Sequence, residues 1–152
     1  MRLAAFTDYG LRVLIVLAST PERQTTTARL AEELAIPYNH LAKVVQDLGR
    51  GGYLATQRGA GGGMRLARTP EAIGLGEIVR FLEQRYAIVE CFRTDGGECL
   101  LTPGCRVRGR LAAAREAFLA ELDKTSIAEC AHPGPLAGPL NGPLVEDAGS
   151  VR

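Results

Sequence analysis

A stretch of five small residues, Gly59-Ala60-Gly61-Gly62-Gly63, restricts the possible fold more than any other feature of this sequence. A helix does not tolerate such a stretch, because each glycine costs a helix about 1 kcal/mol relative to alanine. The residues on either side, 53–56 and 64–66, have the composition of short strands. The pattern therefore predicts a β-hairpin whose turn is the glycine stretch.

Three helical patterns precede this hairpin. The first is expected to begin near Asp8, with Thr7 as its N-cap. The second follows the three threonines at 25–27, which can cap a helix, and ends before Pro37. The third has one apolar face, formed by Leu41, Val44, Val45 and Leu48. Helix, short helix, turn, helix and hairpin together predict a winged helix-turn-helix, so the expected fold is mainly α with a small two-stranded β-wing.

Two more helical patterns follow the hairpin. The second of them is the longest of the chain, at about 105–122, and would span about 27 Å. Its apolar residues recur at steps of three and four: Val107, Leu111, Ala114, Phe118 and Leu122. Such a seam favours contact with another helix and predicts a homodimer, with packing inside one chain as the alternative.

These patterns divide the chain into four parts. We expect a winged helix-turn-helix DNA-binding domain at 1–85 and a cysteine-rich loop at 86–104. A dimerisation helix with a short following helix occupies 105–131. The remainder, 132–152, is rich in proline and glycine, and we expect it to lack regular structure.

The charge of the chain is informative only locally. The net charge of +1 says nothing about nucleic acid, but residues 37–68 hold five basic side chains and one acidic one. We expect the DNA-binding residues to be Thr27, Tyr38, Asn39, His40, Lys43, Arg50, Arg58 and Arg65. Asn39 or His40 would read bases, Lys43 and Arg50 would contact phosphates, and Arg58 at the tip of the wing would enter a minor groove. Any one of these side chains could instead simply solvate an exposed face.

Three of the four cysteines form the pattern C-x7-C-x5-C, at Cys91, Cys99 and Cys105. The pattern lacks the close cysteine pair of structural zinc sites, so thiolates of such wide spacing suit an iron–sulfur cluster better. A structural loop and a thiol–disulfide switch remain alternatives. Three cysteines leave a cluster one ligand short, and the fourth ligand could be a carboxylate, a histidine or an exogenous small ligand. Cys130 is expected to be a buried structural thiol, and His132 to be exposed.

Several classes of protein are disfavoured by what the sequence lacks. It has no C-x-x-C motif and no cysteine–histidine arrangement, which argues against a thiol oxidoreductase and against an enzyme in general. The apolar run at 13–18 is too short for a secretory core or a membrane span. We therefore expect a cytoplasmic protein with no membrane partner.

Several segments carry a resemblance to a known family. They are the opening Met1-Arg2-Leu3, the segment Phe6-Thr7-Asp8-Tyr9-Gly10-Leu11-Arg12, the segment Pro37-Tyr38-Asn39-His40-Leu41 with Lys43-Val44-Val45, and the wing Arg58-Gly59-Ala60-Gly61-Gly62-Gly63-Met64-Arg65-Leu66. With the cysteine loop and the long helix, they are similar to the NsrR branch of the bacterial IscR/NsrR (Rrf-type) superfamily. The resemblance covers about residues 1–130.

This resemblance implies a homodimeric winged-helix repressor of palindromic operator DNA, with long helices that cross between subunits. It implies an iron–sulfur cluster on Cys91, Cys99 and Cys105, of the 4Fe–4S type or alternatively 2Fe–2S, with Asp8 of the partner subunit as fourth ligand. It also implies that nitric oxide is the signal and that the regulated genes detoxify nitric oxide. Sensing of iron, cluster supply or redox stress by the same fold is the alternative.

Two positions depart from the pattern of the superfamily. The IscR type has a histidine ligand three residues after the third cysteine, where this chain has Arg108. The spacing of seven residues between Cys91 and Cys99 is wider than the resemblance leads us to expect. The first departure argues against IscR-type ligation, and the second leaves the type of cluster open.

Overall fold

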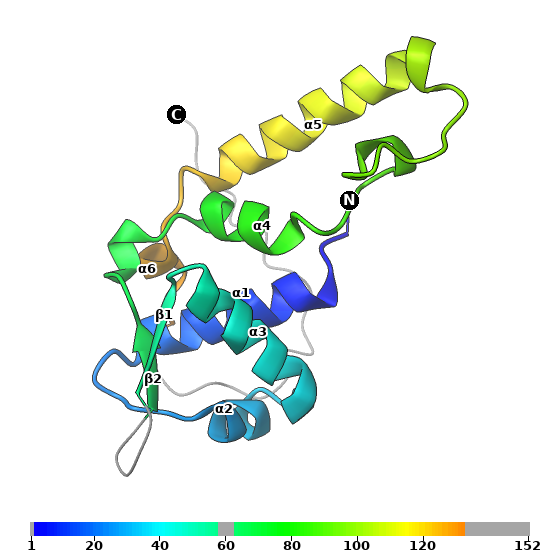
Figure 1. Cartoon of the computed structure of the whole chain (residues 1–152). Helices are drawn as coiled ribbons and strands as arrows, with labels where there is room; N and C mark the ends of the chain where they lie inside the picture. The colour runs from blue at the N-terminus through cyan, green and yellow to red at the C-terminus, as the bar shows by residue number, and fades with distance from the viewer. Residues whose placement is uncertain (1, 58–62, 133–152) are drawn as a thin grey trace, which may run out of the picture.

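The computed structural model describes residues 2–57 and 63–132, and it is mainly helical with one two-stranded sheet (Figure 1). Its elements are α1 (Ala5–Ser19), α2 (Thr27–Glu33), α3 (Tyr38–Arg50), β1 (Leu54–Gln57), β2 (Gly63–Leu66), α4 (Leu75–Glu83), α5 (Arg106–Leu122) and α6 (Ile127–Cys130). Three short 3₁₀ turns, η1 (Pro70–Ala72), η2 (Glu90–Phe92) and η3 (Thr102–Gly104), lie in the connections. The order and type of the elements confirm the winged helix-turn-helix. Arg58 and the tail after His132 lie outside the described residues.

Helix α1 is the centre of the domain and contacts α3, α4 and α6. It begins at Ala5, so the predicted start near Asp8 was wrong, and so was the prediction that Thr7 is its N-cap. The backbone NH groups of Thr7 and Asp8 both donate to the carbonyl of Ala4, which is the N-cap residue. The side chain of Thr7 is fully buried against the core instead of facing the helix end.

The two helices of the helix-turn-helix are joined by a tight turn. The side chain of Thr26 caps α2 by accepting from the backbone NH of Arg29, which confirms the predicted threonine cap. After α2 the chain turns at Ala35, whose φ of 52° is left-handed, a conformation that costs a non-glycine residue about 1–2 kcal/mol. The predicted apolar face of α3 is confirmed, because Leu41, Val44 and Leu48 are fully buried.

The wing follows α3 directly. Strands β1 and β2 are antiparallel, with Leu54 opposite Leu66 and Gln57 opposite Gly63. The backbone NH of Met64 also donates to the carbonyl of Thr25 at 2.7 Å, which attaches the wing to the residues before α2. The two predicted strands are therefore paired, and β2 lies against the helix-turn-helix, while residues 59–62 of the predicted glycine turn lie outside the described residues.

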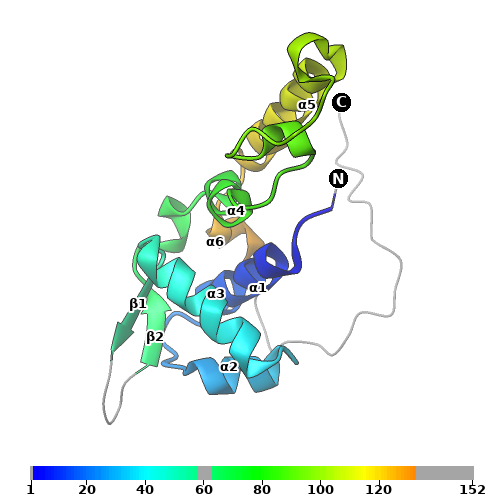
Figure 2. The same ribbon diagram turned by 45° about the vertical axis from the view of Figure 1, so that its right-hand side comes forward.

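Helix α5 is buried most deeply on its own chain near its C-terminal end. Leu119 is the only buried residue of α5, and it contributes to the contact with α4. The predicted seam is only partly covered by the described part of the chain, since Val107 is 61% exposed and Ala114 is exposed, whereas the other three residues of the seam are half-buried. The N-terminal half of α5 projects away from the winged domain (Figure 2). A homodimer contact along this seam stays a prediction.

After α5 the chain returns to the winged domain. The backbone NH of Ile127 donates to the carbonyl of Ile73, and the side chain of Ile127 is fully buried in the core. Cys130, at the end of α6, is half-buried, so the prediction of a buried thiol holds only in part. Partial burial raises the pKa of the Cys130 thiol. His132 is exposed, as predicted, and its backbone NH donates to the hydroxyl of Ser19.

Candidate functional site

The N-terminal part of α3 presents a row of polar side chains to solvent. Tyr38 is 54% exposed, and Asn39, His40 and Lys43 are exposed as well. Burial of Leu41 and its neighbours on the opposite face fixes this orientation, because residues three and four apart share one side of a helix. A recognition helix uses its N-terminal residues to contact base edges, so the predicted residues of α3 occupy the position that base readout requires.

The wing adds a second group of side chains near the start of α2. Arg65 is exposed on β2, and Thr27 is the first residue of α2. A hollow between the wing and the N-terminal side of α2 is lined by Arg65, Thr56, Gln57 and Gln24. Gln24 is not among the residues that the sequence predicts to bind DNA. Its only signal in the sequence is its place before the threonines, and the pairing of Thr25 with Met64 brings it beside the wing.

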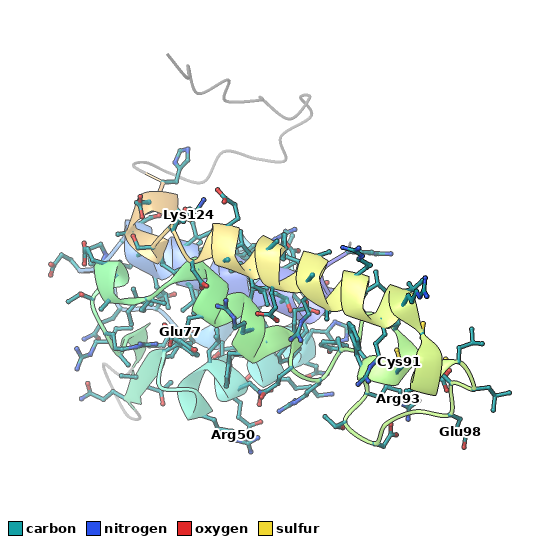
Figure 3. The ribbon with its side chains drawn as sticks, turned by 90° about the horizontal axis from the view of Figure 1, so that it is seen from above. Arg50, Glu77, Cys91, Arg93, Glu98 and Lys124 are labelled. Atoms are coloured by element: carbon teal, nitrogen blue, oxygen red, sulfur yellow. The ribbon has the colours of Figure 1, made fainter. Side chains whose placement is uncertain are left out.

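Arg50 lies at the other end of α3 and does not join the row formed by Tyr38 to Lys43. Its guanidinium is 3.5 Å from the carboxylate of Asp47, and its side chain is 67% exposed. Figure 3 shows Arg50 at the edge of the molecule, away from the cysteine loop. An exposed arginine in this position is suited to a phosphate contact and not to base readout.

The three loop cysteines lie in the irregular segment between α4 and α5. Cys91 is in η2, Cys99 precedes η3, and Cys105 is the N-cap residue of α5. All three are free thiols and half-buried. Figure 3 shows Cys91 near the N-terminal end of α5, at the opposite end of that helix from Lys124. Cys105 therefore lies where the positive end of the helix dipole favours a thiolate.

The seven residues between Cys91 and Cys99 form a defined turn. Arg93 donates to the carboxylate of Asp95, and the same carboxylate accepts from the backbone NH of Gly97 at 3.0 Å. These hydrogen bonds hold the pKa of Asp95 below its usual range, with that from Arg93 the largest cause. Gly96 and Gly97 have φ values of 83° and 59°, a region that favours glycine. The wide spacing is thus occupied by a compact ion-paired turn.

The donor set of this loop fits an iron–sulfur cluster in chemistry, although its thiols are not gathered. Within residues 2–57 and 63–132, no three histidine, cysteine or acidic side chains lie close enough to hold a metal ion. Three thiols on one irregular segment are nevertheless the soft ligands that such a cluster takes. The hydroxyl oxygen of Thr102, between Cys99 and Cys105, is buried and has no hydrogen-bond partner among the described residues. A buried donor of this kind suits a thiolate or sulfide acceptor.

Asp8 lies in the first turn of α1 and is not grouped with the cysteines of its own chain. Its carboxylate is 2.7 Å from the guanidinium of Arg12, one helical turn later, and both side chains are about half exposed. An exposed pair at this spacing contributes only about 0.3–0.5 kcal/mol. Asp8 is therefore held weakly enough to take another partner.

No helix in the described part of the chain is both long and apolar enough to cross a membrane.

Comparison with known proteins gives a consistent result. The Rrf2 family model, described as an iron-dependent transcriptional regulator, matches residues 3–133. The chain is 44% identical over 153 aligned residues to the HTH-type transcriptional regulator NsrR of Geobacillus kaustophilus (strain HTA426), covering 100% of this chain and 95% of that protein. It is also 44% identical over 128 residues to NsrR of Bacillus subtilis (strain 168), covering 84% of this chain and 88% of that protein.

Solved structures agree with this result. CymR (YrzC), described as the global cysteine regulator of B. subtilis, superposes with a TM-score of 0.66 at 26% identity, covering 86% of this chain and 96% of that one. A structure of IscR from T. potens superposes with a TM-score of 0.64 at 22% identity, covering 85% of each chain. At that identity the second likeness concerns the fold alone.

Proposed function

Because this chain belongs to the Rrf2 family of transcriptional regulators, we propose that it is a repressor whose affinity for DNA depends on an iron–sulfur cluster that senses nitric oxide. The chain is a DNA-binding regulator and not an enzyme. The nature of the cluster and of its signal is the proposal. The controlled genes would be those for nitric oxide detoxification.

The observation that carries this proposal is the set of three free thiols on one segment. Cys91, Cys99 and Cys105 are half-buried, and α4 and α5 bound the segment that holds them. A cluster there would supply iron that nitric oxide can coordinate in place of a protein ligand. We favour a 4Fe–4S cluster, and a 2Fe–2S cluster would use the same three thiols.

The fourth ligand in this proposal is Asp8 of the partner subunit. Within one chain the carboxylate of Asp8 pairs with Arg12, at 2.7 Å. If the cluster were lost, Asp8 would be released from iron and could pair again with Arg12. The first helix of one subunit would then no longer be linked to the cysteine loop of the other. Such a change can alter the distance between the two DNA-binding domains of the dimer.

The DNA partner would be a palindromic operator. A two-fold dimer places two copies of α3 in successive major grooves, so the half-sites would be about one turn of DNA apart. The partly uncovered seam of α5, which includes the exposed Val107, supports the dimer. Asn39 and His40 would contact bases, and Lys43, Arg50, Arg58 and Arg65 would contact phosphates or groove walls.

The test is an anaerobic visible absorption spectrum of the purified protein during titration with nitric oxide. We expect a brown chromophore that nitric oxide destroys near-stoichiometrically. Cys99→Ala is expected to be colourless, whereas Cys130→Ala, the matched cysteine outside the loop, is expected to keep the colour. A wild-type protein that stays colourless after reconstitution with iron and sulfide would refute the proposal.

Sensing of iron or cluster supply is the second candidate function, favoured by the description of the family as iron-dependent. The same absorption spectrum distinguishes this function from nitric oxide sensing. A chromophore that is unchanged by nitric oxide but is lost when the cells are grown with an iron chelator would favour this candidate.

A further inference from the structure

The C-terminal end of α4 is a junction of three segments that the proposed function keeps separate. The cysteine loop begins there, five residues before Cys91. The side chain of Glu83 accepts a hydrogen bond from the backbone NH of Ala4, the N-cap residue of α1, at 2.8 Å. The side chain of Arg85 contacts α3. The end of α4 and the two residues after it therefore contact both the start of α1 and the recognition helix.

The contact with α3 is an ion pair with a buried acid. Asp47 is the only buried charged residue in the described part of the chain, with 9% of the residue exposed. Its carboxylate is 2.9 Å from the guanidinium of Arg85, and the more distant Arg50, at 3.5 Å, comes from α3 itself. A largely buried carboxylate without a partner is costly, and Arg85, whose side chain is 62% exposed, is its nearer cationic partner and the one that comes from outside α3.

An aromatic contact lies beside this ion pair. Phe81 lies in the last turn of α4 and Arg85 two residues after the helix ends, and both side chains contact the C-terminal end of α3 or the residues just after it. The ring of Phe81 packs against Tyr53, with ring centroids 5.1 Å apart. A Cβ on Gly51 would be 2.6 Å from the Phe81 ring, so the backbone just after α3 lies directly against it. The aromatic contact and the ion pair therefore join α4 and the residues after it to the C-terminal end of α3 at two points.

Only five residues separate Arg85 from Cys91, the first cysteine of the loop. Six residue steps span at most about 20–22 Å when fully extended. Two turns fold this segment: the backbone NH of Tyr86 donates to the carbonyl of Glu83, and that of Phe92 donates to the carbonyl of Val89. Arg85 lies inside the first turn and Cys91 inside the second, so gathering of the three thiols, which are not in metal-binding range of one another, would rearrange a segment that begins at Arg85.

We propose that Arg85, through its ion pair with Asp47, is the positioning residue that transmits the metal state of the cysteine loop to the recognition helix. This inference rests on the proposed function, because it assigns the contact through which cluster occupancy changes DNA affinity. Arg85 need not contact DNA or the cluster itself.

The experiment compares the DNA affinity of the cluster-loaded and cluster-free forms of each variant. The probe is a duplex that the cluster-loaded wild-type protein recovers from a random-sequence library. For the wild type we expect the two affinities to differ by at least about fivefold, as coupled sites usually do. For Arg85→Ala we expect the ratio to fall to within about twofold of one, because the ion pair that joins this segment to α3 is then absent. Arg85→Lys, which keeps the positive charge, is expected to retain part of the difference in DNA affinity between the two forms.

Arg50→Ala is the matched control. This arginine approaches the same carboxylate, but from within α3, so its loss is expected to lower the affinity of both forms by the same factor and to leave the ratio unchanged. The double variant Arg85→Ala/Asp47→Asn is expected to have the same ratio as Arg85→Ala alone, since both changes remove one contact.

A second readout requires no DNA. Amide hydrogen exchange of residues 38–50 is expected to differ between the two forms of the wild type and to be equal in the two forms of Arg85→Ala. Retention of the wild-type ratio and of the exchange difference by Arg85→Ala would overturn this inference alone. A wild-type ratio of one in a coloured protein would instead overturn the proposed function, and the inference with it.

Discussion

The crossing of α4 and α5 depends on the absence of a side chain at Gly76. A Cβ at this position would lie 2.8 Å from the backbone carbonyl oxygen of Leu119 and 2.1 Å from the carboxylate of Asp123, whereas real Cβ atoms essentially never come within 3.0 Å of other atoms. Asp123 is a side chain and can move, although it pairs with Arg80. The carbonyl of Leu119 is backbone of α5 and cannot move without moving the helix. Gly76→Ala is therefore expected to push α5 away from α4.

The expected loss of stability follows from the apolar surface that α5 buries. Leu119 is 3% exposed and is the only buried side chain of α5. Full burial of a leucine stabilises by about 1.5–3 kcal/mol, and overpacking of this kind typically costs about 1–3 kcal/mol. Alanine gains up to about 1 kcal/mol over glycine in helix propensity. The expected net loss for Gly76→Ala is about 1–2 kcal/mol, which corresponds to a fall in Tm of about 2–8 °C for a chain of this length.

Thermal unfolding followed by circular dichroism at 222 nm measures this loss. Gly109→Ala is the matched control, because Gly109 lies on α5 and a Cβ there meets nothing within 4 Å among the described residues. It is expected to raise Tm, since it keeps the gain in helix propensity without the clash. If Gly76→Ala is as stable as the wild type or more stable, a Cβ at position 76 does not displace α5 from α4.

Three further predictions concern other parts of the chain. Lys43→Ala is expected to weaken DNA binding about equally for specific and random duplexes and to lower the salt dependence of the binding constant. Lys124→Ala, beyond the far end of α5, is expected to leave binding unchanged. Filter-binding titrations at several salt concentrations measure both effects. Thr7→Val is expected to stabilise the protein by about 1 kcal/mol in urea unfolding, because the buried hydroxyl of Thr7 has no partner within the described residues; a loss of stability would show that the hydroxyl is bonded. Burial raises the pKa of Tyr53 to about 12, so the folded state favours the protonated phenol. Its contribution to stability is complete below pH 10, where the unfolded group titrates, and is lost as pH rises toward 12. Unfolding of Tyr53→Phe should lack this part of the alkaline loss, and an identical pH dependence in both proteins would contradict the prediction.

Local residue patterns are sufficient to predict most of the helices and the two strands of this chain. The apolar spacing of Leu41, Val44 and Leu48 fixed the buried face of α3 and therefore the exposed face that carries Asn39 and Lys43. The glycine stretch fixed the hairpin, because no other element accepts it. The threonines before α2 marked a cap, and the structure confirms it at Thr26. These features depend on residues within a few positions of one another, so local propensity and periodicity are sufficient to predict them.

Other features depend on packing between distant parts of the chain and are seen only in the folded structure. Thr7 lies in the core and not at a helix end, because the packing of α1 outweighs the capping preference of threonine. Ala35 adopts a left-handed conformation that the sequence did not signal, because the packing of α2 against α3 requires a tight turn. The pairing of Asp47 with Arg85 joins residues 38 positions apart. Periodicity identifies which face of a helix is apolar, but it contains no information about which distant side chain will meet that face, and only the packed chain supplies it.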